Sequence, residues 1–233
     1  MGSTVVVAMD GPSGSGKSST ARGVADRLGL RYLDTGAQFR AMALWMLRQG
    51  IDVNDAGAVA AHAGEPEIVS GTDPLEPTIR LDGQDVATEI RSVEATAAVS
   101  PVATVPAVRQ QLLELQRAII ATALAEGGIV VEGRDIGSVV WPEAEVKLYL
   151  TADPAARAAR RAAENGSGSV ENTEAELLRR DAIDSGRTAA PLVAPQGAVH
   201  LDTTPWDLDE VIDRVVAIVE EARHAAATDR TSS

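Results

Sequence analysis

The 233-residue chain is 45% hydrophobic and 24% charged, a composition that suits one α/β domain carrying a small insertion. Its 34 acidic and 21 basic residues give a formal net charge of −13, which argues against non-specific binding to DNA, RNA or an anionic membrane. The absence of cysteine excludes disulfides and thiolate metal sites. No signal-peptide or membrane-span pattern is present, so we expect a cytoplasmic protein, compatible with a monomer.

A phosphate-binding loop is predicted near the N-terminus. Residues 5–9 form a β-branched apolar run that predicts a buried strand, and apolar residues recur at helical spacing over residues 20–28. The pattern GxxxxGKS lies between them, which is the strand–loop–helix context of a P-loop. Its backbone N–H groups bind phosphates, Lys17 reaches the β- and γ-phosphates, and the Ser18 hydroxyl is suited to Mg²⁺. The motif predicts nucleotide binding without identifying the reaction.

The next elements continue a strand–helix alternation. Residues 31–33 predict a strand, and Asp34 or Thr35 can cap a helix that extends to Gly50. Phe39, the only phenylalanine of the chain, suits the core or the site equally well. Arg40 lies one turn into this helix, beside the strand end that neighbours the P-loop.

After this helix the predicted elements change from alternating strands and helices to short strands joined by local turns. Residues 67–69 and 77–81 predict strands, Asp82-Gly83 predicts a tight turn, and the return strand begins at Asp85. A helix over residues 89–99 closes the segment, and Ser100-Pro101 is predicted to break it. We interpret residues 62–100 as a small antiparallel insertion.

The second half returns to alternating elements. A helix is predicted over residues 106–125, with Arg109 in its first turn, where the helix dipole disfavours a positive charge. Residues 129–131 predict a buried strand that ends in Glu132-Gly-Arg-Asp135, and charges at such a strand end lie where α/β sheets bind ligands. Further strands are predicted over residues 145–151 and 198–202, a last helix follows, and residues 228–233 are expected to form a frayed tail.

Two arginine-bearing helices flank a Gly/Ser break at residues 165–169. The first begins at Asp153-Pro154 and carries Arg157, Arg160 and Arg161, and the second begins near Thr173. We interpret residues 153–189 as a lid over phosphates, while a solvated helical hairpin remains the alternative.

Separate motifs, in this order, resemble those of bacterial-type cytidylate kinases, the CMP/dCMP kinases of the P-loop nucleoside monophosphate kinase family. They are Asp10-Gly-Pro-Ser-Gly-Ser-Gly-Lys-Ser18, Leu33-Asp-Thr-Gly-Ala-Gln-Phe-Arg40, Glu132-Gly-Arg-Asp-Ile-Gly137, Arg180-Asp-Ala-Ile-Asp-Ser-Gly-Arg187 and Ala190-Pro-Leu192. The resemblance covers residues 5–222. It implies a three-layer α/β P-loop kinase fold with a parallel central sheet, a small antiparallel insertion that binds the nucleoside monophosphate, and a helical lid. The core would comprise residues 1–61 and 101–227, and the CMP-binding insertion residues 62–100.

The resemblance also implies site residues. ATP would be held by the P-loop residues Gly11, Pro12, Ser13, Gly14, Ser15, Gly16, Lys17, Ser18 and Ser19, with Mg²⁺ as cofactor at Ser18. CMP would contact Thr35, Arg40, Ser100, Arg109, Arg134, Asp135, Arg180, Asp184 and Arg187. Of these, Ser100, Arg109 and Asp135 would lie near the cytosine, Asp184 with Arg180 at the sugar, and Arg40, Arg134 and Arg187 at the acceptor phosphate. The catalytic cations would be Lys17, Arg134, Arg187, Arg157 and Arg161. Thr35 and Phe39 stand where serine and tyrosine are common, and only the second departure loses a hydroxyl.

The implied reaction is the transfer of phosphate from ATP to CMP or dCMP. The acceptor is already an anionic phosphate oxygen, so the reaction requires positioning and charge neutralisation rather than a strong base. Asp135 can accept a hydrogen bond from the exocyclic amine of cytosine, which favours CMP over UMP. The alternatives are a small-molecule P-loop kinase for AMP, UMP or shikimate, a GTP-binding switch, whose Asn-Lys-x-Asp motif this chain lacks, and a non-enzymatic nucleotide-binding regulator. Asp10 is a candidate for ordering Mg²⁺ waters, or it only stabilises the loop.

Overall fold

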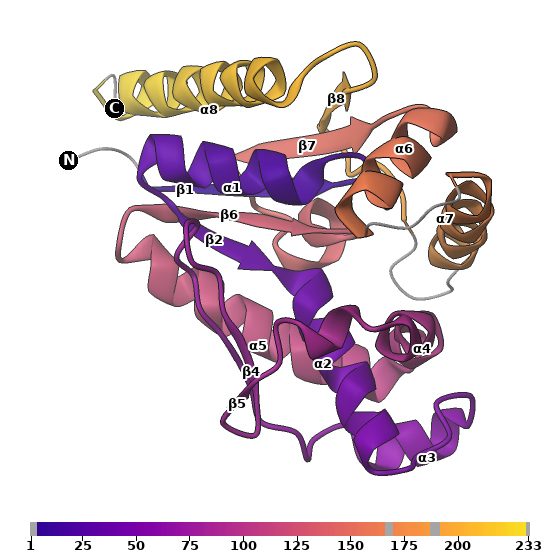
Figure 1. Cartoon of the computed structure of the whole chain (residues 1–233). Helices are drawn as coiled ribbons and strands as arrows, with labels where there is room; N and C mark the ends of the chain where they lie inside the picture. The colour runs from indigo at the N-terminus through magenta and orange to yellow at the C-terminus, as the bar shows by residue number, and fades with distance from the viewer. Residues whose placement is uncertain (1–3, 166–169, 187–191, 232–233) are drawn as a thin grey trace.

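A five-stranded parallel sheet forms the centre of the molecule, seen in a computed structural model that describes residues 4–165, 170–186 and 192–231 (Figure 1). The strand order is β2-β6-β1-β7-β8. The strands are β1 (Val5–Asp10), β2 (Arg31–Asp34), β6 (Gly128–Gly133), β7 (Val146–Thr151) and β8 (Val199–Asp202). Since all pairings are parallel, the carboxyl ends of the strands meet at one edge of the sheet.

Helices cover both faces of this sheet. Along β1 every residue is buried, and side chains alternate, so that Val5, Val7 and Met9 pack on one face while Val6 and Ala8 pack on the other. The first face is covered by α1 (Lys17–Leu28) and α8 (Leu208–Thr231), and the second by α5 (Pro106–Leu124) and the π-helical turn η2 (Ile136–Val140). The three-layer prediction is confirmed.

The lower lobe in Figure 1 has its own hydrophobic core and its own sheet. Its antiparallel strands have the order β3-β4-β5, and the Asp82-Gly83 turn between β4 and β5 has positive φ at both residues, 49° and 79°, as a type I′ hairpin turn requires. The elements are α2 (Thr35–Arg48), α3 (Ala56–Ala61), β3 (Ile68–Ser70), β4 (Ile79–Leu81), β5 (Gln84–Asp85), the 3₁₀ turn η1 (Glu89–Arg91) and α4 (Val93–Ala103). The predicted small antiparallel sheet is confirmed.

Some predicted boundaries are wrong. Helix α4 does not break at Ser100-Pro101 but continues to Ala103, because Ala98 and Val102 on either side of the proline are buried in the lobe's core. Helix α3 was not predicted, although Asp55 caps it by accepting from the N–H groups of residues 57 and 58. Helix α8 continues through the tail predicted from Thr228, because residues 225–227 are alanines with high helix propensity.

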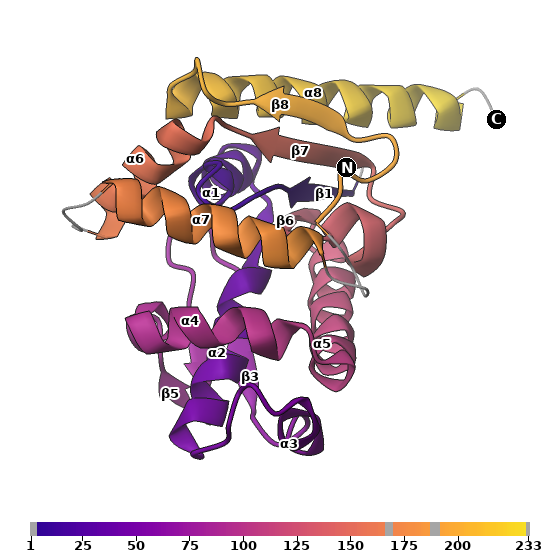
Figure 2. The same ribbon diagram turned by 90° about the vertical axis from the view of Figure 1, so that its right-hand side faces the viewer.

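Helices α6 (Pro154–Asn165) and α7 (Val170–Ser185) form the third part of the molecule. Figure 2 shows α7 crossing above α4, with which it is in contact, so these helices border the space in front of the sheet's carboxyl edge. Within the described ranges, none of the helices has the length and apolar character that a membrane crossing requires.

Candidate active site

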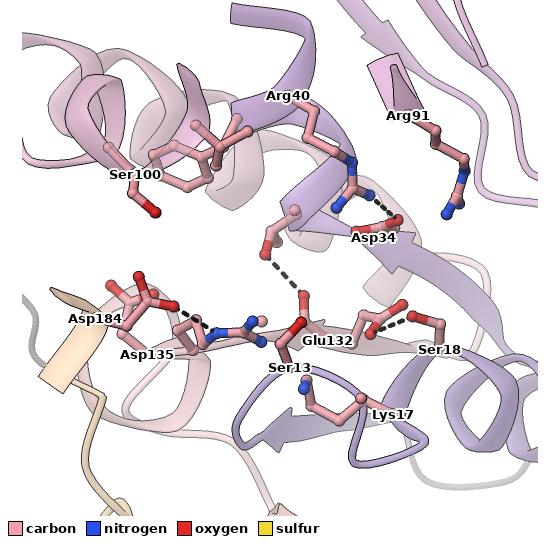
Figure 3. A pocket seen from close by; sticks show the side chains of 18 of the residues that line it. Ser13, Lys17, Ser18, Asp34, Arg40, Arg91, Ser100, Glu132, Asp135 and Asp184 are labelled. Carbon is pink, nitrogen blue, oxygen red and sulfur yellow. Dashed lines mark hydrogen bonds and ion pairs between the residues drawn. The ribbon is translucent and has the colours of Figure 1, made fainter. Parts of the chain in front are cut away.

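A cavity opens at the carboxyl edge of the sheet, between the P-loop, the lower lobe and α7 (Figure 3). It brings together most of the residues selected from the sequence. Those that line it are Ser13, Gly14, Gly16, Lys17, Ser18, Ser19, Thr35, Arg40, Ser100, Arg109, Arg134, Asp135, Arg161 and Asp184. Gly11, Pro12, Ser15 and Arg157 do not line it. Arg187 and the side chain of Arg180 lie outside the described residues.

Two glycines of the P-loop allow contacts that a side chain would prevent. At Gly11, with φ of 147°, a Cβ would lie 2.1 Å from the carbonyl oxygen of Leu150 on β7. At Gly14, with φ of 77°, a Cβ would lie 3.1 Å from the carbonyl oxygen of Arg157 on α6. The loop therefore packs directly on the sheet and on the lid, and both positions require glycine.

Lys17 is buried beneath this loop, with 6% of its surface exposed. Its Nζ donates to the Pro12 carbonyl at 2.6 Å and approaches the Ser15 hydroxyl at 3.4 Å. Burial, and then the nearby Arg134 guanidinium, lower the pKa of Lys17 to about 7. A phosphate at this loop would favour the charged ammonium, so the lysine is held in a place where an anion stabilises it.

Glu132 is a site residue whose role the sequence analysis did not identify. Its buried carboxylate accepts from the Ser18 hydroxyl at 2.9 Å and from the Tyr32 hydroxyl at 2.5 Å. Burial, followed by the charge of Asp34, raises the pKa of Glu132, and burial also raises that of Tyr32. The position of Glu132 at the end of β6, beside the strand that leads into the P-loop, was the signal that could have identified it.

The oxygen donors at Ser18 and Glu132 have the chemistry that Mg²⁺ prefers. Among the described residues, no group of three or more His, Asp or Glu side chains could hold a metal ion. Ser18 and Glu132 thus fit an ion that is held jointly with water and substrate phosphates, the usual arrangement for Mg²⁺.

Asp10 stabilises the loop rather than facing the cavity. Its carboxylate is fully buried, and its two oxygens accept from the N–H groups of Ile136 at 2.7 Å and Gly137 at 2.8 Å. Of the two roles left open for this residue, the geometry favours the second. Burial raises the pKa of Asp10 from 3.8 to about 6, against the opposing effect of the two N–H donors.

This raised pKa predicts a pH-dependent contribution to stability. Between pH 4 and 6 the unfolded chain loses its Asp10 proton while the folded chain retains it, so the contribution of Asp10 falls as pH rises. We expect the free energy of unfolding of the wild type, minus that of Asp10→Asn, to fall by about 2 kcal/mol between pH 4.5 and 7. Urea denaturation of both proteins at several pH values measures this difference in the free energy of unfolding. The exposed Asp26→Asn is the control, and a difference that does not change with pH would refute the assignment.

Three arginines in the cavity are paired with carboxylates. Arg40 lies 2.9 Å from Asp34, and Arg134 lies 3.0 Å from Asp184. The third pair joins Arg109 to Asp135. This pair explains why a cation is tolerated in the first turn of α5, where the helix dipole opposes it. A second nitrogen of Arg134 donates to the Gly11 carbonyl at 2.9 Å, so this residue joins the P-loop to α7.

The lid helices are also bonded to the P-loop. Arg157, buried on α6, donates to the Ser13 carbonyl at 3.0 Å and pairs with Asp181 on α7. Asp181 in turn accepts from the Ser13 N–H at 3.3 Å. Arg157 thus binds the loop rather than lining the cavity, whereas Arg161, one turn later, does line it.

The cavity is also lined by residues that were not assigned to the site from the sequence. Phe39 is partly buried and lines the cavity, with the Arg109 guanidinium 5.5 Å from its ring centroid, so both of the roles considered for it apply. Asp34 lines the cavity as the partner of Arg40. Arg91 also lines it, and no motif of the sequence pointed to this residue.

Comparison with known proteins shows which family the chain resembles. The family model described as cytidylate kinase matches residues 7–221. A cytidylate kinase of Streptomyces avermitilis is 55% identical over 221 residues, covering 95% of each chain, and one of Mycobacterium leprae is 47% identical over 221 residues, covering 93% of this chain and 96% of the relative. A solved gluconokinase of Sinorhizobium meliloti, with a TM-score of 0.52 at 13% identity, covers 98% of this chain and 99% of its own, a likeness that concerns the fold alone.

Proposed function

The chain belongs to the cytidylate kinase family, and on that premise we propose that it transfers the γ-phosphoryl group of ATP to CMP, and to dCMP, giving ADP and CDP or dCDP. The observation that carries the proposal is a single cavity that joins a P-loop to a set of arginine–carboxylate pairs. A donor nucleotide and an acceptor phosphate can meet in such a cavity.

On the donor side, the P-loop is the proposed site of the ATP phosphates. Its N–H groups and the N-terminus of α1 attract anions, and Lys17 supplies a cation beneath them. Ser18 and Glu132 would hold Mg²⁺, which when bound neutralises charge on the β- and γ-phosphates. The buried Tyr32 hydroxyl fixes the orientation of the Glu132 carboxylate.

On the acceptor side, the arginine pairs supply both charge and base recognition. Arg40 and Arg134, together with Arg187, would bind the CMP phosphate through their planar guanidinium groups. Asp135 and Arg109 would contact the cytosine beside Ser100, and Asp184 with Arg180 would bind the sugar. An arginine held by a carboxylate is already oriented, so less ordering is needed when the phosphate binds.

The proposed chemistry is a direct displacement. An oxygen of the CMP phosphate forms a bond to the γ-phosphorus of ATP, and the bond between that phosphorus and the bridging β-oxygen breaks, so that the electron pair leaves with ADP. Lys17, Arg134 and the lid arginines Arg157 and Arg161 would offset the negative charge that spreads over the transferred group. Arg157 would have to exchange its contact with Ser13 for the substrate, which would couple lid movement to ATP binding.

Several further properties belong to this proposal. The proposed partners are the small molecules ATP and CMP or dCMP, with Mg²⁺ as cofactor and without a nucleic-acid polymer or a membrane. We also propose a monomer in the cytoplasm, and a division into a core of residues 1–61 and 101–227, a lid of residues 153–189 and an insertion of residues 62–100.

An acceptor panel tests the function. ADP release is measured with Mg-ATP and each of CMP, dCMP, UMP, AMP, GMP and shikimate. The proposal requires strong release with CMP and dCMP alone. Release with AMP or shikimate instead would contradict the acceptor, and no acceptor-dependent release with any of them would place the protein among nucleotide-binding switches or regulators.

Base recognition by Asp135 gives a separate prediction. An amide at this position can donate to the exocyclic oxygen of uracil, whereas the carboxylate can only accept. We expect Asp135→Asn to lower the ratio of kcat/KM for CMP to that for UMP by about 10- to 100-fold, with the KM for ATP within about twofold of the wild type. Steady-state kinetics with both acceptors measure the ratio, and an unchanged ratio would show that the base is read elsewhere.

A further inference from the structure

Arg91 lies at the rim of the cavity, at the end of η1 in the lower lobe. Figure 3 shows its side chain extending toward the part of the cavity where Asp34 and Ser18 lie. A smaller neighbouring hollow is also lined by Arg91, Asp34 and Ser18. The guanidinium is therefore near a residue of the donor side, Ser18, and a residue of the acceptor side, Asp34.

The backbone that carries Arg91 is firmly held. The preceding residue, Ile90, is 1% exposed and belongs to the lobe's core. Glu89 pairs with Arg48 of α2 at 2.5 Å, and the following Ser92 caps α4 by accepting from the Ala95 N–H at 3.2 Å. The side chain of Arg91 thus starts from a fixed position and is itself exposed.

The contacts among the described residues do not account for the charge of Arg91. Within residues 4–165, 170–186 and 192–231, its guanidinium makes no hydrogen bond or ion pair, in contrast to the pairs formed by Arg40, Arg109 and Arg134. It also immediately precedes the N-cap of α4, where the helix dipole disfavours a cation. A positive charge at this place costs some helix stability, and a bound anion would compensate for it.

The charges around the cavity agree with this interpretation. The lining residues include six cationic and four anionic side chains, so a formal excess of positive charge faces the cavity. The carboxylates Asp34, Asp135 and Asp184 each pair with a different arginine, none of them Arg91. An unpaired arginine fork is suited to phosphate oxygens, which it can bind in a bidentate manner.

We propose that Arg91 is a further phosphate-binding residue of the transfer reaction, contacting the phosphoryl group as it passes between the donor side at Ser18 and the acceptor side at Arg40. The inference rests on the proposed function. Because the transferred group lies between the two sides only during the reaction, the contact acts mainly on kcat. The opposing view is that Arg91 is an ordinary solvated arginine, which would leave the kinetics unchanged.

The test compares Arg91→Ala, Arg91→Lys and Arg80→Ala with the wild type. Arg80 is an exposed arginine on β4 of the same lobe that does not line the cavity, so it is a matched control. We expect Arg91→Ala to lower kcat by about 10- to 100-fold, as for the loss of a charged hydrogen bond in a transition state, with the KM values for ATP and CMP within about threefold. The kcat of Arg91→Lys should lie between those of Arg91→Ala and the wild type, because lysine keeps the positive charge but lacks the planar guanidinium that binds phosphate in a bidentate manner.

The possible outcomes distinguish a failure of the role proposed for Arg91 from a failure of the proposed function. If the wild type and Arg80→Ala phosphorylate CMP and Arg91→Ala does so at the same rate, the role of Arg91 is refuted and the function stands. A raised KM with an unchanged kcat would equally overturn the assignment to the transferring group. If the wild type itself does not phosphorylate CMP, the proposed function fails instead.

Discussion

Replacing Lys17 with alanine should lower kcat for CMP phosphorylation by about 1000-fold. The ammonium lies beneath the P-loop, where it would neutralise the charge that moves between the β- and γ-phosphates. Single-turnover kinetics at saturating ATP and CMP measure the effect.

Lys147, the only other lysine of the chain, provides the control. It lies on β7 outside the lining of the cavity, so Lys147→Ala should keep kcat within about twofold of the wild type. If Lys17→Ala retained the wild-type kcat, Lys17 would have no part in the mechanism.

Loss of Arg134 should have the next largest effect, because this residue joins the P-loop to α7 and itself lines the cavity. It donates to Gly11 in the P-loop, pairs with Asp184 on α7 and lines the cavity beside Asp135. We expect Arg134→Ala to lower kcat/KM for CMP by about 100- to 1000-fold, through lost phosphate binding and a misplaced lid. Steady-state kinetics measure it, and Arg134→Lys should recover only part of the loss, since the ammonium lacks the guanidinium fork.

Arg117→Ala is the matched control for this prediction. Arg117 also donates to main-chain carbonyls, those of Val139 and Val140, but it lies on α5 outside the lining of the cavity. If Arg134→Ala and Arg117→Ala lost equal amounts of kcat/KM for CMP, Arg134 would act through protein stability alone. A full recovery by Arg134→Lys would argue against bidentate binding of phosphate.

Most of the fold could be predicted because its signals are local. The β-branched run before the P-loop, the Asp82-Gly83 turn and the proline that opens α5 each determine nearby backbone. The error at Pro101 has another origin. A proline disfavours helix in the residue before it, but packing of Ala98 and Val102 in the lower lobe outweighs this local preference, and no sequence window shows that packing.

The residues of the candidate site also differ in whether the sequence alone reveals them. Motif residues such as Lys17, Arg40 and Arg134 could be selected from the sequence, since their spacing carries a mechanism. The place of Glu132 at a strand end could be inferred from the sequence, but its contact with Ser18 could not, because the two residues are 114 positions apart. Arg91 is an ordinary arginine in the sequence, and only its place at the rim of the cavity and the lack of a partner among the described residues distinguish it.

We propose above all that this cavity passes a phosphoryl group from ATP to the phosphate of CMP. The most direct measurement follows the label from [γ-³²P]ATP in the presence of CMP and Mg²⁺, with the products separated by thin-layer chromatography. We expect label to appear in CDP in step with ADP formation, with little in inorganic phosphate, and we expect Lys17→Ala to lose the label in CDP. Label that accumulates in inorganic phosphate, or that stays in ATP while CMP is unchanged, would contradict it.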